Sequence, residues 1–178
     1  MLGGLRAVGA AGAHSMRVLG VDYGERRIGL AVSDPSATLA RPLRTLRPGG
    51  SLPSRAAAVA AEARALAEDA DGLAAVVVGL PRSLDGTPHE QTARVLAFVD
   101  RLREAIDVPV ALQDERLTSV EAESRLAARE KSWRKRSERL DAAAAAVILQ
   151  DHLDEHRPPG GPAASPAGRV TATSGRRR

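Results

Sequence analysis

The order of apolar and polar residues along the chain predicts an α/β fold. Apolar runs with few charges predict strands within residues 18–24, 27–34, 74–81 and 108–115. The first two are joined by the tight connection Gly24-Glu25-Arg26, which predicts an antiparallel hairpin. Residues 38–46 (TLARPLRTL) predict a third, short strand, and Pro42 would confine it to an edge or a bulge.

Apolar residues at helical spacing predict four helices. They are expected within residues 53–71, 89–105, 118–130 and 140–156. Residues 74–81 (AAVVVGLP) are apolar on both faces, which is typical of a buried strand in a parallel sheet. The predicted architecture is therefore a mixed sheet flanked by helices, in which the hairpin is antiparallel and the later strands are parallel through right-handed crossovers.

The two ends of the chain differ in composition from its middle. Residues 1–15 are rich in Gly and Ala without sustained periodicity, and we expect them to be a disordered or alternative-start extension. Residues 157–178 are rich in Pro, Gly, Ser and Arg, and we expect a disordered Arg-rich tail. The predicted domain spans residues 16–156.

The basic charge of the chain belongs to its tail. The sequence pI is about 10.5 and the formal net charge is +4. Residues 157–178 hold five arginines and no acid, which leaves residues 1–156 with a formal charge of −1. Any nucleic-acid surface on the predicted domain must therefore come from local patches.

Composition excludes several kinds of site. The chain has no cysteine, which excludes disulfides, thiolate zinc sites and cysteine nucleophiles. One Trp, one Tyr and one Phe are too few for base-stacking platforms. No apolar run approaches the length of a membrane span, so a cytoplasmic protein is expected.

Acidic residues stand where predicted elements begin or end. Asp22 and the pair Asp114-Glu115 lie at the carboxyl ends of predicted strands, where ligands collect in α/β sheets. Only one of Asp114 and Glu115 can face a given side of the sheet. Asp141 begins the predicted Ala-rich helix, where it could instead be an N-cap or first-turn acid. If Asp22, Glu115 and Asp141 converge, their carboxylates predict a site for one or two hard divalent cations.

Three motifs, in order across residues 16–156, resemble the YqgF-type proteins, which are described as pre-16S rRNA nucleases and as Holliday junction resolvases. The motifs are VLGVDYGERRIGLAVSD, then VVVGLPRSLDGTPHEQTARV, then LQDERLTSVEAE followed by LDAAAAAVIL. The resemblance implies a ribonuclease H-like fold and a nuclease of nucleic-acid phosphodiesters. It also implies that Asp22, Glu115 and Asp141 are catalytic acids that bind Mg²⁺ or Mn²⁺, and it selects Glu115 over Asp114.

The resemblance leaves alternatives open. The substrate could be a ribosomal RNA precursor or branched DNA, and the chain could be an inert nucleic-acid-binding module. Related resolvases have a fourth acid, for which Asp34 and Asp85 are spare candidates, although turn contexts favour structural roles for both. The predicted phosphate contacts are Arg27, Arg82, Arg116, Lys135, Arg136 and Arg139. Residues 131–139, which hold the last three, are predicted to form a mobile loop or a solvated linker.

Overall fold

The computed structural model describes residues 16–81, 90–115 and 133–157. The helix predicted within residues 118–130 and the two predicted disordered ends lie outside these ranges, apart from Arg157. The strands are β1 (Arg17–Tyr23), β2 (Ile28–Ser33), β3 (Ala40–Leu46), β4 (Leu73–Pro81) and β5 (Val110–Glu115). The helices are α1 (Leu52–Glu68), α2 (Glu90–Ala105) and α4 (Trp133–Glu155). Each predicted strand is confirmed, as are the helices expected within residues 53–71 and 89–105.

The five strands form one mixed sheet in the order β3-β2-β1-β4-β5. β1 pairs antiparallel with β2, and β2 antiparallel with β3. β4 pairs parallel with both β1 and β5. Pro42 lies on the edge strand β3, where its pairing with β2 shifts register, as expected for a residue without a backbone N–H. The arrangement confirms the predicted α/β fold with a mixed sheet, an antiparallel hairpin and flanking helices.

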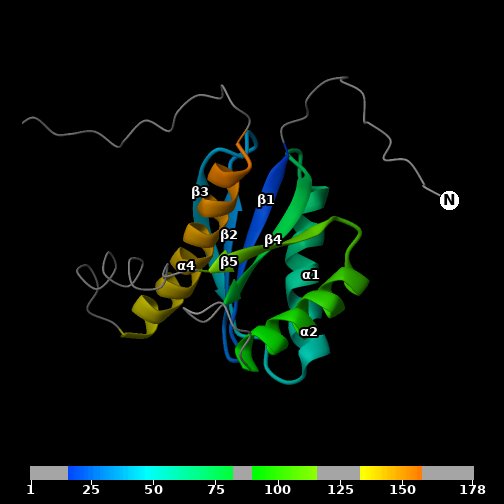
Figure 1. Cartoon of the computed structure of the whole chain (residues 1–178), viewed down its shortest axis with the longest axis vertical. Coiled ribbons are helices and arrows are strands. Elements are labelled where there is room, and N and C mark those ends of the chain that lie inside the picture. Colours follow the sequence, from blue (N-terminus) through cyan, green and yellow to red (C-terminus); the bar gives the residue numbers. More distant parts are fainter. Residues whose placement is uncertain (1–15, 82–89, 116–132, 158–178) are drawn as a thin grey trace, which may run out of the picture.

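Helices cover both faces of the sheet (Figure 1). Because side chains alternate along a strand, Leu19 and Val21 of β1 face α1 and α2, whereas Val18 and Gly20 face α4. Phe98 of α2 is fully buried in the larger core and stacks on Tyr23 with ring centroids 4.3 Å apart. The smaller core on the other face combines Val18, Ala31 and Val77 with residues of α4, namely Ala145, Ile148, Leu149 and Leu153.

Glycines on β1 and β2 let α4 lie close against the hairpin. A Cβ built on Gly20 would lie 2.7 Å from Cβ of Leu149. A Cβ on Gly29 would lie 1.9 Å from the carbonyl oxygen of Asp141, which is a severe overlap with backbone. Ala142 and Ala145 are buried on the helix side of the same contact. The spacing between this helix and the sheet is therefore set by the absence of side chains.

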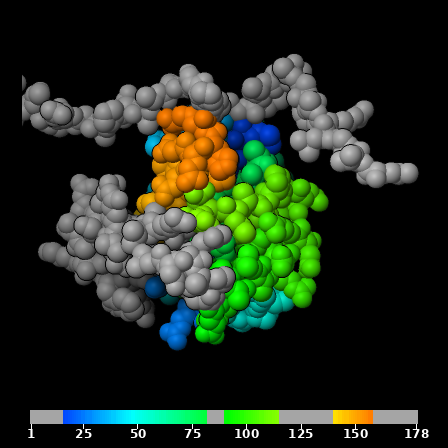
Figure 2. Space-filling view, in the orientation of Figure 1, coloured from blue at the N-terminus to red at the C-terminus, as the bar shows by residue number. Residues whose placement is uncertain are grey.

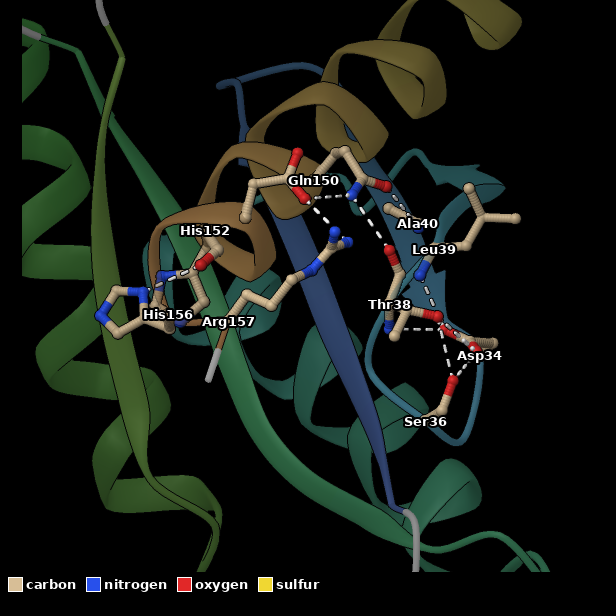
Figure 3. Close-up of polar contacts among 10 residues, drawn as sticks. Asp34, Ser36, Thr38, Leu39, Ala40, Gln150, His152, His156 and Arg157 are labelled. Carbon is tan, nitrogen blue, oxygen red and sulfur yellow. Dashed lines mark hydrogen bonds and ion pairs between the residues drawn. The ribbon is translucent and has the colours of Figure 1, made fainter. Parts of the chain in front are cut away.

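Polar contacts hold the C-terminal half of α4 to two other parts of the sheet. The Gln150 side chain accepts a hydrogen bond from the Ala40 N–H at 2.9 Å and donates one to the Thr38 carbonyl at 3.1 Å (Figure 3). On β5, Gln113 is buried and its Oε1 lies 3.0 Å from Nδ1 of His152. The space-filling view shows this part of α4 beside β5 (Figure 2).

The start of α4 differs from the sequence-based expectation. The helix begins at Trp133, so residues 133–139 are helical, and the prediction of a loop over residues 131–139 is wrong from Trp133 onward. Asp141 consequently lies inside the helix, and its interpretation as an N-cap or first-turn acid is wrong as well. Good helix formers such as Arg, Lys and Glu allow this charged stretch to continue the Ala-rich helix.

Gly29→Ala should test the contact between α4 and the hairpin. The added methyl group would overlap the Asp141 carbonyl, so the helix or the strand must move. We expect the free energy of unfolding, measured in urea, to fall by about 1–3 kcal/mol or more. Gly49→Ala is the matched control, because nothing lies within 4 Å of the added atom. Equal stability of the two variants would contradict the close approach.

Candidate metal-binding active site

Asp22 and Asp141 line one cavity at the end of the sheet where β1 ends and β2 begins. Asp22 comes from β1 and Asp141 from α4. The cavity has a volume of about 540 Å³. The described residues that line it are Asp22, Tyr23, Gly24, Glu25, Arg26, Arg27, Gln91, Arg94 and Asp141. Two of the three predicted acids are therefore brought together from distant parts of the chain.

The backbone of β1 directs Asp22 to the α4 side of the sheet. Asp22 pairs with Gly29, and it lies two residues beyond Gly20, which contacts α4. Burial, with a further contribution from the negative charge of Asp141, raises the pKa of Asp22 to about 6 from an ordinary value of 3.8. Two carboxylates near each other in a partly dry site favour a bound cation, which would relieve both effects.

Asp141 forms an ion pair with Arg27 of the hairpin turn. Arg27 Nε lies 2.9 Å from Oδ2 of Asp141, and the two side chains are 34% and 22% exposed. That oxygen is shielded from solvent, and the contact lacks the alignment of a hydrogen bond. A cationic group thus lies against one of the two carboxylate oxygens of Asp141.

The turn between β1 and β2 fixes the backbone at Arg27. The Gly24 N–H donates a hydrogen bond to the Arg27 carbonyl at 3.0 Å. A Cβ on Gly24 would lie 2.6 Å from that same oxygen, so the tight turn requires glycine here. On the other side of Arg27, Ile28 is fully buried. The guanidinium therefore extends from a well-anchored backbone.

Helix α2 supplies the opposite wall of the cavity. Arg94 Nη1 lies 2.6 Å from Glu25 of the hairpin turn, and Arg94 also pairs with Glu90 one helical turn away. Gln91 lines the same wall. Sequence reasoning did not identify Gln91 or Arg94. The Glu90–Arg94 spacing is visible in the sequence as an i,i+4 pair, but nothing in it signals the contact with Glu25.

Glu115, the third predicted acid, is the last residue of β5. Its Cα pairs with that of Pro81 at the end of β4. The carboxyl ends of β1, β4 and β5 lie at the same edge of the sheet, because these strands are parallel. Gln113, two residues earlier, contacts α4. The side chain of Glu115 lies outside the described part of the structure, so its role remains a prediction.

The residues predicted to contact phosphate lie in different parts of the chain. Arg27 lies in the cavity with the two acids. Lys135, Arg136 and Arg139 belong to α4, on the N-terminal side of Asp141, and the description does not extend to their side chains. The remaining two predicted arginines and one spare acid fall in undescribed segments: Arg82, Arg116 and Asp85.

Asp34, the other spare acid, has a structural role. It follows β2 at the end of the strand opposite to Gly29, and so it is far from Asp22 along the sheet. Its carboxylate accepts hydrogen bonds from the Ser36 hydroxyl and from the N–H groups of Thr38 and Leu39 (Figure 3). Partial burial acts to raise the pKa of Asp34, but these hydrogen bonds outweigh it and hold the pKa below its usual range.

Within residues 16–81, 90–115 and 133–157, no three His, Asp or Glu side chains are grouped closely enough to hold a metal ion. Asp22 and Asp141 converge at the site, whereas Glu25, the third described acid that lines the cavity, pairs with Arg94, so a metal site here needs further ligands. No helix in these ranges is long and apolar enough to cross a membrane.

The fold and the carboxylate pair define an α/β protein with an acidic site at the carboxyl end of its first strand. Residues 16–155 match the family model RuvX, described as Holliday junction resolvase, and the chain belongs to this family. The resemblance predicted from the three motifs is confirmed.

Curated relatives carry the name "Putative pre-16S rRNA nuclease". The protein from Chloroflexus aggregans is 45% identical over 142 residues, which cover 80% of this chain and 96% of the relative. That from Anaeromyxobacter dehalogenans strain 2CP-C is 46% identical over 143 residues, covering 80% and 100%. Among solved structures, T. thermophilus RuvC in complex with a Holliday junction substrate aligns with 79% of this chain and 94% of its own, at 19% identity and a TM-score of 0.46.

Asp22→Asn should stabilise the metal-free protein at neutral pH. Because the folded-state pKa lies above the ordinary value, ionised Asp22 opposes folding. This penalty is absent below pH 3.8, develops up to a pH of about 6 and is complete above it. Urea unfolding in EDTA at pH 7.5 should show the variant to be more stable by up to about 3 kcal/mol, with no gain near pH 3.5.

Asp34→Asn is the matched control for that experiment. The pKa of Asp34 is lowered in the folded protein, so its charge stabilises the fold above pH 3.8. We expect this variant to be less stable than the wild type at pH 7.5. A destabilised Asp22→Asn protein at the same pH would contradict the electrostatic description of the site.

Proposed function

We propose that the chain is a metal-dependent endonuclease that hydrolyses nucleic-acid phosphodiesters, with maturation of the 5′ end of pre-16S ribosomal RNA as its function in the cytoplasm. The observation that carries the proposal is the convergence of Asp22 and Asp141 in one cavity, where burial and their mutual repulsion raise the pKa of Asp22. Membership of the RuvX family supports the same activity.

The residues at the site fit a hard divalent cation. Asp22 and Asp141 offer carboxylate oxygens, and Glu115 at the end of β5 is the proposed third ligand. Oxygen ligands with no thiolate suit Mg²⁺ or Mn²⁺. When bound, such an ion supplies a nucleophilic water at neutral pH and stabilises negative charge on the leaving oxygen.

The protein's own residues position the substrate. Arg27 lies in the cavity and can contact a phosphate there. The proposed contacts on the rest of the backbone come from Arg82, Arg116, Lys135, Arg136 and Arg139, with the arginines of residues 157–178 adding affinity that does not depend on sequence. On this proposal, side chains of the hairpin and of α4 hold the reacting phosphate, and charged side chains around them hold the rest of the nucleic-acid strand.

The names of the relatives favour RNA as the substrate, whereas the description of the family model favours a DNA junction. Both substrates would use the same acids. We propose RNA because the relatives at 45% and 46% identity, matched over 96% and 100% of their own length, carry the RNA name.

Asp22→Asn, Glu115→Gln and Asp141→Asn should each reduce cleavage by at least about two orders of magnitude, because a metal ion contributes several kcal/mol of transition-state stabilisation. Each substitution preserves shape and removes a charge that would hold the ion. Cleavage of a precursor-like RNA in Mg²⁺, with Mn²⁺ binding measured in parallel, provides the test. Asp114→Asn is the control, as it removes the exposed acid beside Glu115. Wild-type cleavage by all three variants would refute the site.

Depletion of the protein in cells should separate the two substrates. If RNA is the substrate, mapping of ribosomal RNA 5′ ends should show accumulated 16S precursor while recombination stays intact. In a separate assay, the purified protein should trim precursor RNA faster than it cuts a four-way DNA junction. Efficient symmetric cleavage of the junction with normal ribosomal RNA would establish the DNA alternative. Binding of RNA without cleavage, whether or not Mg²⁺ or Mn²⁺ is present, would identify an inert module.

A further inference from the structure

The ion pair between Arg27 and Asp141 joins a residue of the hairpin turn to a proposed metal ligand. Its 2.9 Å separation places a positive charge directly on Oδ2 of Asp141, an oxygen shielded from solvent. A buried carboxylate without a compensating charge is strongly unfavourable, and a cationic group is what stabilises it. In the free protein, Arg27 performs this role.

Arg27 and a divalent cation cannot both occupy the same face of one carboxylate oxygen. We propose that Arg27 is a competing cation, which covers Asp141 in the metal-free protein and is displaced when a divalent ion binds, so that its guanidinium becomes available to the phosphate of the substrate. The inference rests on the proposed function, since it takes Asp141 to be a metal ligand.

The local structure makes such an exchange feasible. The backbone at Arg27 is fixed by the turn, but its side chain is 34% exposed and lines the cavity. The contact with Asp141 lacks hydrogen-bond alignment, so it depends mainly on charge. A guanidinium on a long side chain can leave this position by changing rotamers, while the turn keeps it within the cavity.

The exchange also couples metal binding to substrate binding. While Arg27 is paired with Asp141, the acid neutralises the charge of the arginine, which is then only weakly available to a phosphate. With the acid occupied by a divalent ion, the same arginine faces the cavity as an uncompensated cation. Guanidinium groups bind phosphate oxygens well, so nucleic-acid affinity should rise when the ion binds.

The test is Mn²⁺ binding by isothermal titration calorimetry to the wild type, Arg27→Gln and Arg26→Gln. Arg26→Gln is the matched control. Arg26 is exposed and lies in the same turn, and its replacement by Gln removes the same charge. Removal of the competitor should tighten Mn²⁺ binding by about tenfold in Arg27→Gln, whereas the loss of a solvated neighbouring charge should change it by less than about threefold in Arg26→Gln. Equal effects in the two variants, or weaker binding by Arg27→Gln, would overturn the proposal.

A second measurement follows the released arginine. RNA affinity is measured with Ca²⁺ and with EDTA, by fluorescence anisotropy of a labelled oligonucleotide. We expect Ca²⁺ to increase the affinity of the wild type and of Arg26→Gln, and to increase that of Arg27→Gln by a clearly smaller factor. The same Ca²⁺ increment in all three proteins would show that Arg27 does not move to the phosphate.

Asp141→Asn separates failure of this inference from failure of the proposed function. If Asp141→Asn binds Mn²⁺ as the wild type does, Asp141 is not a ligand, and both the site and the competition are wrong. The same holds if the wild type binds no Mn²⁺. If Asp141→Asn loses Mn²⁺ while Arg27→Gln behaves like Arg26→Gln, the metal site stands and only the competition is refuted.

Discussion

The close packing of α4 on the β1–β2 hairpin is the constraint on which the site depends. There is no room for a side chain at Gly29 against the Asp141 backbone, and a Cβ on Gly20 would lie 2.7 Å from Cβ of Leu149. Asp22 pairs with Gly29 across the hairpin. The lack of a side chain at Gly29 therefore lets Asp141 of α4 lie beside Asp22. Ordinary side chains at these glycines would hold the helix away from the sheet and separate the acids.

That packing places two negative charges in a partly dry environment, which opposes stability. The pKa of Asp22 is raised, so its ionised form is less favourable in the folded protein than in the unfolded chain. The protein tolerates this because two extensive apolar cores lie behind the site, and because Arg27 neutralises Asp141. Electrostatic strain of this kind is typical of sites that bind a cation or carry out chemistry.

The sequence predicts the elements of the fold well and its long-range contacts poorly. Strands such as 74–81 are identified from continuous apolar residues, and the hairpin from its glycine turn. The start of α4 is missed because residues 131–139 carry charge without an apolar period. Asp22 and Asp141 are identified as candidates by position, but the sequence alone cannot give the helix approach that joins them. The pairing of Arg94 with Glu25 is beyond local patterns for the same reason.

The two ends of the sheet show how one residue type serves different purposes. Asp34 and Asp22 lie at opposite ends of the paired strands β2 and β1, and each is an aspartate at a strand terminus. Asp34 receives hydrogen bonds from its own loop, so its charge is satisfied locally and stabilises a turn. Asp22 faces α4 and another acid, and its charge is destabilising. Acids whose pKa is raised by burial and by a neighbouring acid cluster at functional sites, and this contrast makes the Asp22 end, rather than the Asp34 end, the place to look for chemistry.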